Sequence, residues 1–220
     1  MTIEQPLLRP LSRPAALWRR WVAAVTVGEF LGFLAPATAA AATAHAGAGV
    51  TAAAMLTAGA VEGAVLGAFQ SSVLRSALPH WRTAPWIGVT AAAAVVAWTL
   101  GMMPMLFGER VARWPLWVQI PAVVAAGLVV VFSLGVAQWT VLRHYCARAA
   151  LWPWGNAIGW IAGLCVFTAV TTPWWQPGQS AAQIAAIGAV GGLAMAAAVA
   201  VVTGVFLVRT IGEGEGRTRG

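Results

Sequence analysis

Long runs of apolar residues, separated by short clusters of arginine, proline and tryptophan, make up most of the chain. Val50–Ala68 and Ile184–Val208 are two of these runs, and neither consists of short alternating segments as strands would. In a lipid bilayer, runs of this length satisfy their backbone polar groups only as helices. The pattern predicts an all-α, polytopic integral membrane protein with six transmembrane helices, at about 16–37, 49–76, 84–106, 117–144, 153–173 and 181–209.

Composition agrees with this interpretation. Of the 220 residues, 60% are hydrophobic and 9% are charged, whereas about one quarter of a soluble domain is charged. The first apolar run is long enough to span and lacks a clear cleavage signature, so we expect no secretory signal. We expect a cytoplasmic N-terminal segment at 1–15, a transmembrane domain at 16–209 and a Gly-rich, charged, disordered tail at 210–220.

The arginines predict the orientation in the membrane. Eleven of them flank the start of the first helix, the second-to-third and fourth-to-fifth connections, and the end of the sixth helix, whereas only Arg110 and Arg113 lie on the other side. The positive-inside rule therefore places both termini in the cytoplasm, in a cell membrane of the bacterial inner-membrane type. This distribution of arginines also accounts for the net charge of +7, so we expect no binding to nucleic acid.

Tryptophans cluster at both predicted membrane surfaces, as an aromatic belt does, and anchoring to lipid headgroups accounts for most of them. The inner set is Trp18, Trp21, Trp81, Trp86, Trp152 and Trp154, and the outer set is Trp114, Trp117, Trp174 and Trp175. Two others, Trp98 and Trp160, fall near the middle of predicted helices.

An internal repeat is visible at the helix ends. Gly67–Arg75 and Gly135–Arg143 both read G-x-x-Q-x-x-V-L-R, 68 residues apart, and the sixth helix ends Leu207-Val208-Arg209, with Gly204 in the place of the glutamine. We therefore expect three tandem hairpins of one orientation, at about 16–76, 84–144 and 153–209, related by a pseudo-threefold axis along the membrane normal.

The segment Gly135–Arg143 also carries a resemblance to a known group. The sequence resembles an uncharacterised family of bacterial multi-pass membrane proteins whose helices end in G-x-x-Q-W-x-V-L-R. The resemblance implies a multi-pass membrane protein and no particular function.

Two acidic residues lie within predicted spans and are functional candidates, because ionisable groups are costly inside a bilayer. Glu29 lies 9 residues beyond Arg20 and Glu62 lies 13 residues before Arg75, so they are roughly 14 and 20 Å deep. The two could share a cavity that binds a substrate or protons, lined also by Trp98 and Trp160, which lie at corresponding positions in the other repeats. The alternative is that each is a protonated side chain that joins neighbouring helices.

The repeated helix ending supplies a second group of candidate residues. Gln70 and Gln138 are expected to cross-link helices or cap a helix end, which we favour over contact with a ligand. Arg75 and Arg143 are expected to anchor the orientation at the headgroups, and could bind anionic lipid.

Four G-x-x-x-G pairs predict close helix approach, in a tight bundle or a homo-oligomer. They are Gly28/Gly32, Gly63/Gly67, Gly159/Gly163 and Gly188/Gly192.

Metal, cofactor and catalytic sites are not predicted. The chain has no Lys and no Asp, which excludes a retinal Schiff base, a Walker lysine and Asp-based metal motifs. Its three histidines fall in predicted loops, and no nucleophile–base pattern occurs. Cys146 and Cys165 lie too far apart in the predicted topology for a disulfide.

These observations lead to two functional hypotheses. One is a small-solute transporter, or the membrane component of one, that binds a small molecule or ion and is proton-coupled through Glu29 and Glu62. The alternative is a non-transporting scaffold, assembly or lipid-binding subunit with a partner membrane subunit. A membrane enzyme is a distant third.

Overall fold

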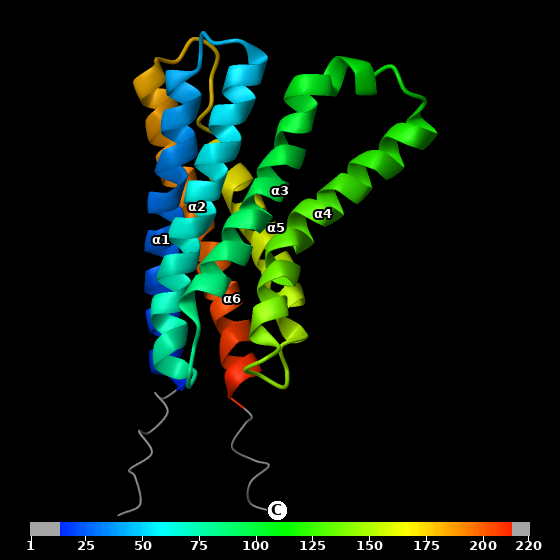
Figure 1. Ribbon diagram of the computed structural model, residues 1–220. Coiled ribbons are helices and arrows are strands. Elements are labelled where there is room, and N and C mark those ends of the chain that lie inside the picture. Colours follow the sequence, from blue (N-terminus) through cyan, green and yellow to red (C-terminus); the bar gives the residue numbers. More distant parts are fainter. Residues whose placement is uncertain (1–13, 213–220) are drawn as a thin grey trace, which may run out of the picture.

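The computed structural model describes residues 14–212, and this part of the chain is all-helical (Figure 1). Its six helices are α1 (Pro14–Ala42), α2 (Ala48–Ala77), α3 (Thr83–Val111), α4 (Leu116–Leu142), α5 (Leu151–Thr171) and α6 (Ala181–Ile211). The prediction of an all-α structure is confirmed for this part of the chain, and each helix is long and apolar enough to cross a membrane, which is compatible with a multi-pass membrane protein. Most of the predicted segments 1–15 and 210–220 lies outside the described residues.

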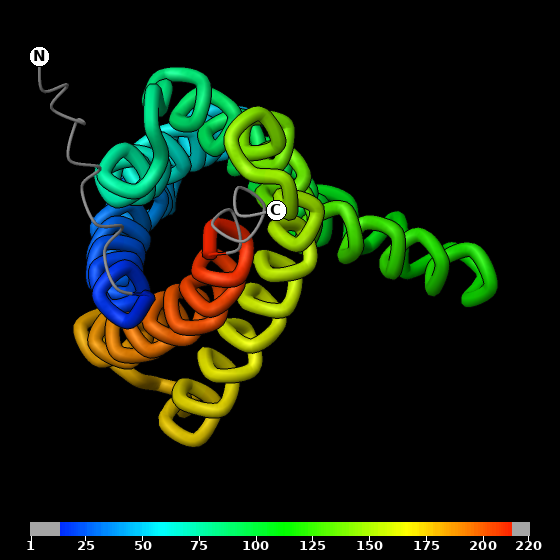
Figure 2. Tube along the Cα trace, turned by 90° about the horizontal axis from the view of Figure 1, so that it is seen from below, coloured from blue at the N-terminus to red at the C-terminus, as the bar shows by residue number. Residues whose placement is uncertain are grey.

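The helices form a ring. Each packs against its neighbours in sequence, and α1 packs against α6 to close the circle (Figure 2). The start of α1 and the end of α6 lie at the same end of the molecule (Figure 1), which we call the proximal end. The α2–α3 and α4–α5 connections share that end, and the other three connections lie at the distal end.

Glycines allow the closest helix contacts. An added Cβ at Gly63 would lie 2.8 Å from the Cα of Ala91 on α3, and one at Gly28 would lie 2.6 Å from the Cβ of Phe69 on α2. Gly159 and Gly163 similarly face α6. The fourth predicted pair, at Gly188 and Gly192, faces open space, because a Cβ at either position would meet nothing within 4 Å.

The α3–α4 hairpin departs from the ring at its distal end, where α4 leans away from the other helices (Figure 1). The buried residues of α4 are Leu134, Gly135, Gln138 and Leu142, all in its proximal half. Its distal half exposes large apolar side chains such as Trp117 at 78% and Ile120 at 58%. In a bilayer this half must be covered by lipid or by another chain.

The proximal core contains three tryptophans, Trp21, Trp86 and Trp152, which come from the three odd-numbered helices and are each 0% exposed. Trp152 stacks edge-on against Trp21, with ring centroids 5.5 Å apart, and lies 6.1 Å from Trp86. Fully buried leucines of the even-numbered helices, Leu74, Leu142 and Leu207, belong to the same core.

The prediction that these three tryptophans anchor the protein to lipid headgroups is therefore wrong. Each comes at the predicted depth along its helix, but on the face that points into the bundle. Tryptophans on outward faces remain available to headgroups, for example Trp154 at 61% and Trp174 at 67% exposed.

Candidate functional site

A small cavity within the bundle is lined by all four residues that were proposed to bind substrate or protons. Glu29 of α1, Glu62 of α2, Trp98 of α3 and Trp160 of α5 surround a space of about 50 Å³. The remaining lining is apolar or glycine: Gly63, Leu66, Ala94, Ala97 and Leu134. Five helices thus contribute to one cavity.

The cavity lies near the middle of the bundle. Glu29 follows Trp21 by eight residues, and Trp160 follows Trp152 by eight residues. At 1.5 Å per residue, both positions are about 12 Å distal to the buried tryptophans. A cavity at that depth in a membrane-spanning bundle is far from bulk water at the proximal end.

Glu29 is the more deeply buried of the two acids. Its side chain is 7% exposed, and its Oε2 atom has no hydrogen-bond partner among residues 14–212. One turn further along α1, a Cβ at Gly32 would lie 3.0 Å from the backbone oxygen of Glu62. The absence of a side chain at Gly32 lets α2 bring Glu62 to the same cavity.

Glu62 is half-buried and has a partner. The indole Nε1 of Trp98 donates a hydrogen bond to its Oε2 at 2.6 Å. The Trp98 ring packs against Gly59, one turn before Glu62, where a side chain would collide with it. Trp98 therefore positions the Glu62 carboxylate, while Trp160 closes the α5 side of the cavity.

Two carboxyl groups with apolar surroundings can bind a neutralising partner. None of the residues described as lining the cavity is basic, so a proton or a small cation must offset any negative charge there. A space of about 50 Å³ admits a few water-sized groups and excludes a larger solute unless the helices move apart.

Gln70 and Gln138 lie outside this cavity, in the proximal core. Gln138 Nε2 donates to Gln70 Oε1 at 2.8 Å and to Thr90 Oγ1 at 3.0 Å. Trp86 Nε1 donates to Gln70 Oε1 at 3.1 Å, and Trp152 Nε1 donates to Gln138 Oε1 at 2.9 Å. The two amides therefore cross-link α2, α3, α4 and α5.

The remaining odd-numbered helix, α1, makes an analogous contact, because Trp21 Nε1 donates to Thr203 Oγ1 of α6 at 3.0 Å. Thr203 precedes the buried Leu207 by four residues, as Gln138 precedes Leu142. The sequence alignment on Arg209 placed Gly204 at this position, one residue too far. In all three repeats the polar residue precedes a buried leucine by four residues, and aligning the sequences on that leucine would have identified Thr203.

Arg75 and Arg143 are both exposed at the proximal end. The Arg143 guanidinium lies over the Trp139 ring, with its Cζ 5.1 Å from the ring centroid. Neither arginine lines the Glu29–Glu62 cavity. The candidate residues thus divide into a central cavity, a proximal hydrogen-bonded core and two surface arginines.

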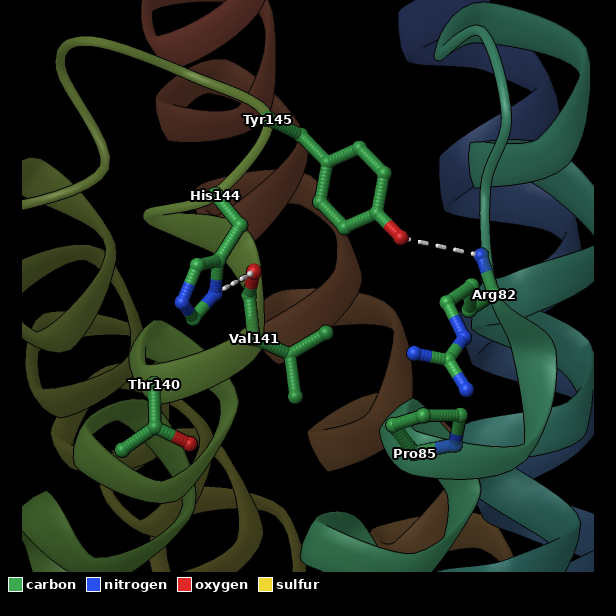
Figure 3. Close-up of a pocket in the computed structure, with 6 residues that line it drawn as sticks. All are labelled: Arg82, Pro85, Thr140, Val141, His144 and Tyr145. Carbon is green, nitrogen blue, oxygen red and sulfur yellow. Dashed lines mark hydrogen bonds between the residues drawn. The ribbon is translucent and has the colours of Figure 1, made fainter.

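A second pocket lies at the proximal end between α3 and α4 and was not anticipated from the sequence. It measures about 370 Å³ and is lined by Arg82, Pro85, Thr140, Val141, His144 and Tyr145 (Figure 3). The Tyr145 hydroxyl accepts a hydrogen bond from the backbone N–H of Arg82 at 3.2 Å. This contact joins the α2–α3 connection to the α4–α5 connection.

Metal and nucleophilic sites are not evident in the described part of the chain. Residues 14–212 contain no group of three His, Cys, Asp or Glu side chains that could hold a metal ion. Burial raises the pKa of the Cys146 thiol to about 11. Since the thiolate is the reactive form, this cysteine is a poor nucleophile near neutral pH.

Comparisons of the chain with protein-family models, with curated proteins and with solved structures gave no match. Its function has to be inferred from the geometry described above.

Proposed function

We propose that the protein is a small-solute membrane transporter, or the membrane component of one, in which Glu29 and Glu62 bind and release a proton. The observation that carries this proposal is the shared cavity: a buried carboxyl group with an unpartnered Oε2 and a second carboxylate line it together, with no basic residue in the lining. Intramembrane carboxyl groups that face a cavity are the usual sites of proton relay in transporters.

Access to the cavity requires the helices to move. The tryptophan–glutamine core lies between the cavity and the proximal surface, and its Trp21, Trp86 and Trp152 side chains are fully buried. The α3–α4 hairpin is the element with the fewest restraints, since the distal half of α4 has no buried residue. Movement of this hairpin, which carries Trp98, would widen the cavity and change the hydrogen bond to Glu62.

The proposed setting is the cytoplasmic membrane, with both termini in the cytoplasm. Support comes from the eleven arginines assigned to the side of the termini, against two on the opposite side. In this orientation the tryptophan–glutamine core faces the cytoplasm, and α4 leans outward toward the external leaflet.

We also propose that the ring consists of three hairpin repeats about a pseudo-threefold axis. Each odd-numbered helix donates an indole N–H to a polar side chain of the even-numbered helix beside it: Trp86 to Gln70, Trp152 to Gln138, and Trp21 to Thr203. When the three repeats are aligned on these tryptophans, the position eight residues later is Glu29 in the first repeat, Ala94 in the second and Trp160 in the third. Trp98 lies one turn beyond Ala94. Both acids of the cavity, Glu29 and Glu62, therefore belong to the first repeat.

The test uses Glu29→Gln and Glu62→Gln, with Glu109→Gln as the matched control, because Glu109 is exposed near the distal end of α3. Purified protein is reconstituted in liposomes, and currents are recorded on a solid-supported membrane while a panel of amino acids, sugars and organic cations is applied with a proton gradient. The wild type and the Glu109→Gln variant should give solute-dependent currents that depend on pH. Both cavity variants should lose them while remaining monodisperse.

A second measurement needs no substrate. Infrared difference spectra between acidic and alkaline pH should contain a carboxyl protonation band of Glu29, which is missing from the spectrum of Glu29→Gln and persists in that of Glu109→Gln. Equal solute currents in all variants, or the absence of any pH-dependent carboxyl signal from Glu29, would contradict proton coupling through this cavity.

A non-transporting subunit is the second candidate, and one observation favours it. Apart from the half-buried Gln119, the distal half of α4 is apolar, with Leu116 at 69% and Val123 at 58% exposed, as expected for a helix that docks on a partner membrane protein. A photo-crosslinking residue at position 123 should then capture one defined partner in cells, and Glu29→Gln should leave that capture unchanged. Crosslinking to lipid alone would contradict this second role.

A further inference from the structure

We propose that the pocket between α3 and α4 at the proximal end binds the phosphate of an anionic phospholipid, with Arg82 as its cationic ligand. The six lining residues combine one guanidinium, one imidazole and two hydroxyl groups with the apolar side chains of Pro85 and Val141 (Figure 3). This inference is independent of the transport proposal, because it uses none of the residues of the central cavity.

The walls of the pocket are held in place by interactions of the two connections. The Tyr145 hydroxyl accepts from the Arg82 backbone N–H and donates to the backbone oxygen of His80 at 3.5 Å. The Trp81 ring lies 4.8 Å from the Tyr145 ring, and Trp81 Nε1 donates to Ser71 Oγ at 2.7 Å. His80, in the α2–α3 connection, has a positive φ of 55°, which residues other than glycine rarely adopt. The hydrogen bonds of Tyr145 to His80 and Arg82 hold this turn in place.

The Arg82 guanidinium has no partner in the described part of the chain. The described carboxylates are those of Glu29, Glu62 and Glu109, and they lie in the central cavity and near the distal end of α3. In Figure 3 the Arg82 guanidinium lies beside Pro85, at the α3 side of the space between α3 and α4. A guanidinium presents paired N–H donors that match a phosphate group.

His144 adds a second nitrogen on the opposite side of the pocket. Its Nδ1 lies 3.2 Å from the backbone oxygen of Val141, so the tautomer with a proton on Nδ1 donates to that oxygen. Its Nε2 has no hydrogen-bond partner among residues 14–212, and in the protonated ring this nitrogen can donate to a phosphate oxygen. Arg82 and His144 thus line the pocket from two different helix ends.

The pocket continues onto a surface that suits an acyl chain. Val136, one turn before Thr140 on the same face of α4, is 46% exposed. Gly88, three residues after Pro85 on α3, is exposed and has nothing within 4 Å of where a Cβ would be. A lipid can therefore place its phosphate at Arg82 and lay a chain along this apolar surface, whereas free phosphate would gain only the polar contacts.

The experiment measures lipid retention by native mass spectrometry of the full-length protein in detergent. Wild type, Arg82→Gln, Thr140→Phe and Arg20→Gln are each incubated with phosphatidylglycerol or with phosphatidylcholine. Thr140→Phe places a bulky ring at the rim of the pocket without changing its charge. Arg20→Gln is the control, because it removes an exposed arginine of α1 at the same end but outside the pocket.

Wild type and Arg20→Gln should retain one phosphatidylglycerol more strongly than phosphatidylcholine. Arg82→Gln should weaken retention of phosphatidylglycerol about fivefold or more, which is the effect of one arginine near a lipid phosphate. Thr140→Phe should weaken this retention to a similar extent, because its ring blocks the rim of the pocket. Thermal unfolding of each variant shows that it is folded. Equal retention by Arg82→Gln and wild type, or equal retention of the two lipids, would overturn the proposal. Displacement of the lipid by inorganic phosphate would identify a soluble anion site instead and overturn it as well.

Discussion

Gln138 shows how one polar side chain can hold several membrane helices together. It is fully buried, its amide nitrogen donates to Gln70 and Thr90, and its amide oxygen accepts from Trp152. Inside an apolar bundle, each of these groups has no water to replace a lost partner. The glutamine therefore joins α4 to three other helices at one point.

Replacing Gln138 with Leu should destabilise the protein by about 1–3 kcal/mol, because three hydrogen bonds of the size measured in membrane bundles are lost. Unfolding of detergent-solubilised protein, followed by circular dichroism, measures the difference. The control is Gln119→Leu on the same helix, since Gln119 has no side-chain hydrogen bond to the described residues and is only half-buried. Equal stability of the two variants would show that the network contributes little.

At the residue scale, depth along a helix was predictable from the sequence, and direction around it was not. Counting from the flanking arginines placed Glu29 and Glu62 at a common depth, and both line one cavity. Trp21, Trp86 and Trp152 were assigned to the surface because the six helices are apolar on every side, so that no periodic polar face marks which side points inward. Only the packed ring shows this.

At the scale of the helix, small residues determine where two backbones come closest. Gly63 lies against the backbone of α3, with Thr90 O 2.8 Å from the position of an added Cβ. Gly188 occurs in the same sequence pattern and faces open space. The G-x-x-x-G pairs of α1, α2 and α5 thus lie at close helix contacts, as the pattern predicts. The pair in α6 makes no close contact within the monomer.

Gly63→Ala should destabilise the protein by about 1–3 kcal/mol, because the added methyl group collides with a backbone that cannot retreat without moving α3. Gly188→Ala should leave stability unchanged or slightly raise it, since Ala favours the helix and meets no neighbour. Thermal unfolding of the two variants side by side tests this. Matching losses would mean that Gly188 is packed against another chain, and size-exclusion chromatography with light scattering would then show a change of oligomeric state.

At the scale of the whole molecule, the even number of helices places the start of α1 and the end of α6 on one side, and we propose from the arginine count that this side faces the cytoplasm. Green fluorescent protein fused after Gly220 should therefore fluoresce in a bacterial host. Alkaline phosphatase inserted in the α3–α4 connection at 112–115 should be active, because it folds only outside the cytoplasm. Active phosphatase at the C-terminus would reverse the orientation.

The six helices could be predicted because length and apolarity determine membrane spans almost alone. The proximal pocket could not, because Arg82 and His144 are 62 residues apart in the sequence and are brought together only by the packing of α3 on α4. Thr203, which accepts a tryptophan N–H group as Gln70 and Gln138 do, could not be predicted either. Its donor, Trp21, lies near the opposite end of the chain.

That last bond has a consequence for how the protein is made. Trp18 and Trp21 are among the first residues of α1 to leave the ribosome, yet their indole N–H groups bond to Val201 and Thr203 in the final helix. During synthesis the ring remains an open arc, with two donors of its earliest helix unsatisfied, until α6 is inserted. Premature termination before α6 would leave an edge available to insertases, quality-control proteases or another unfinished copy.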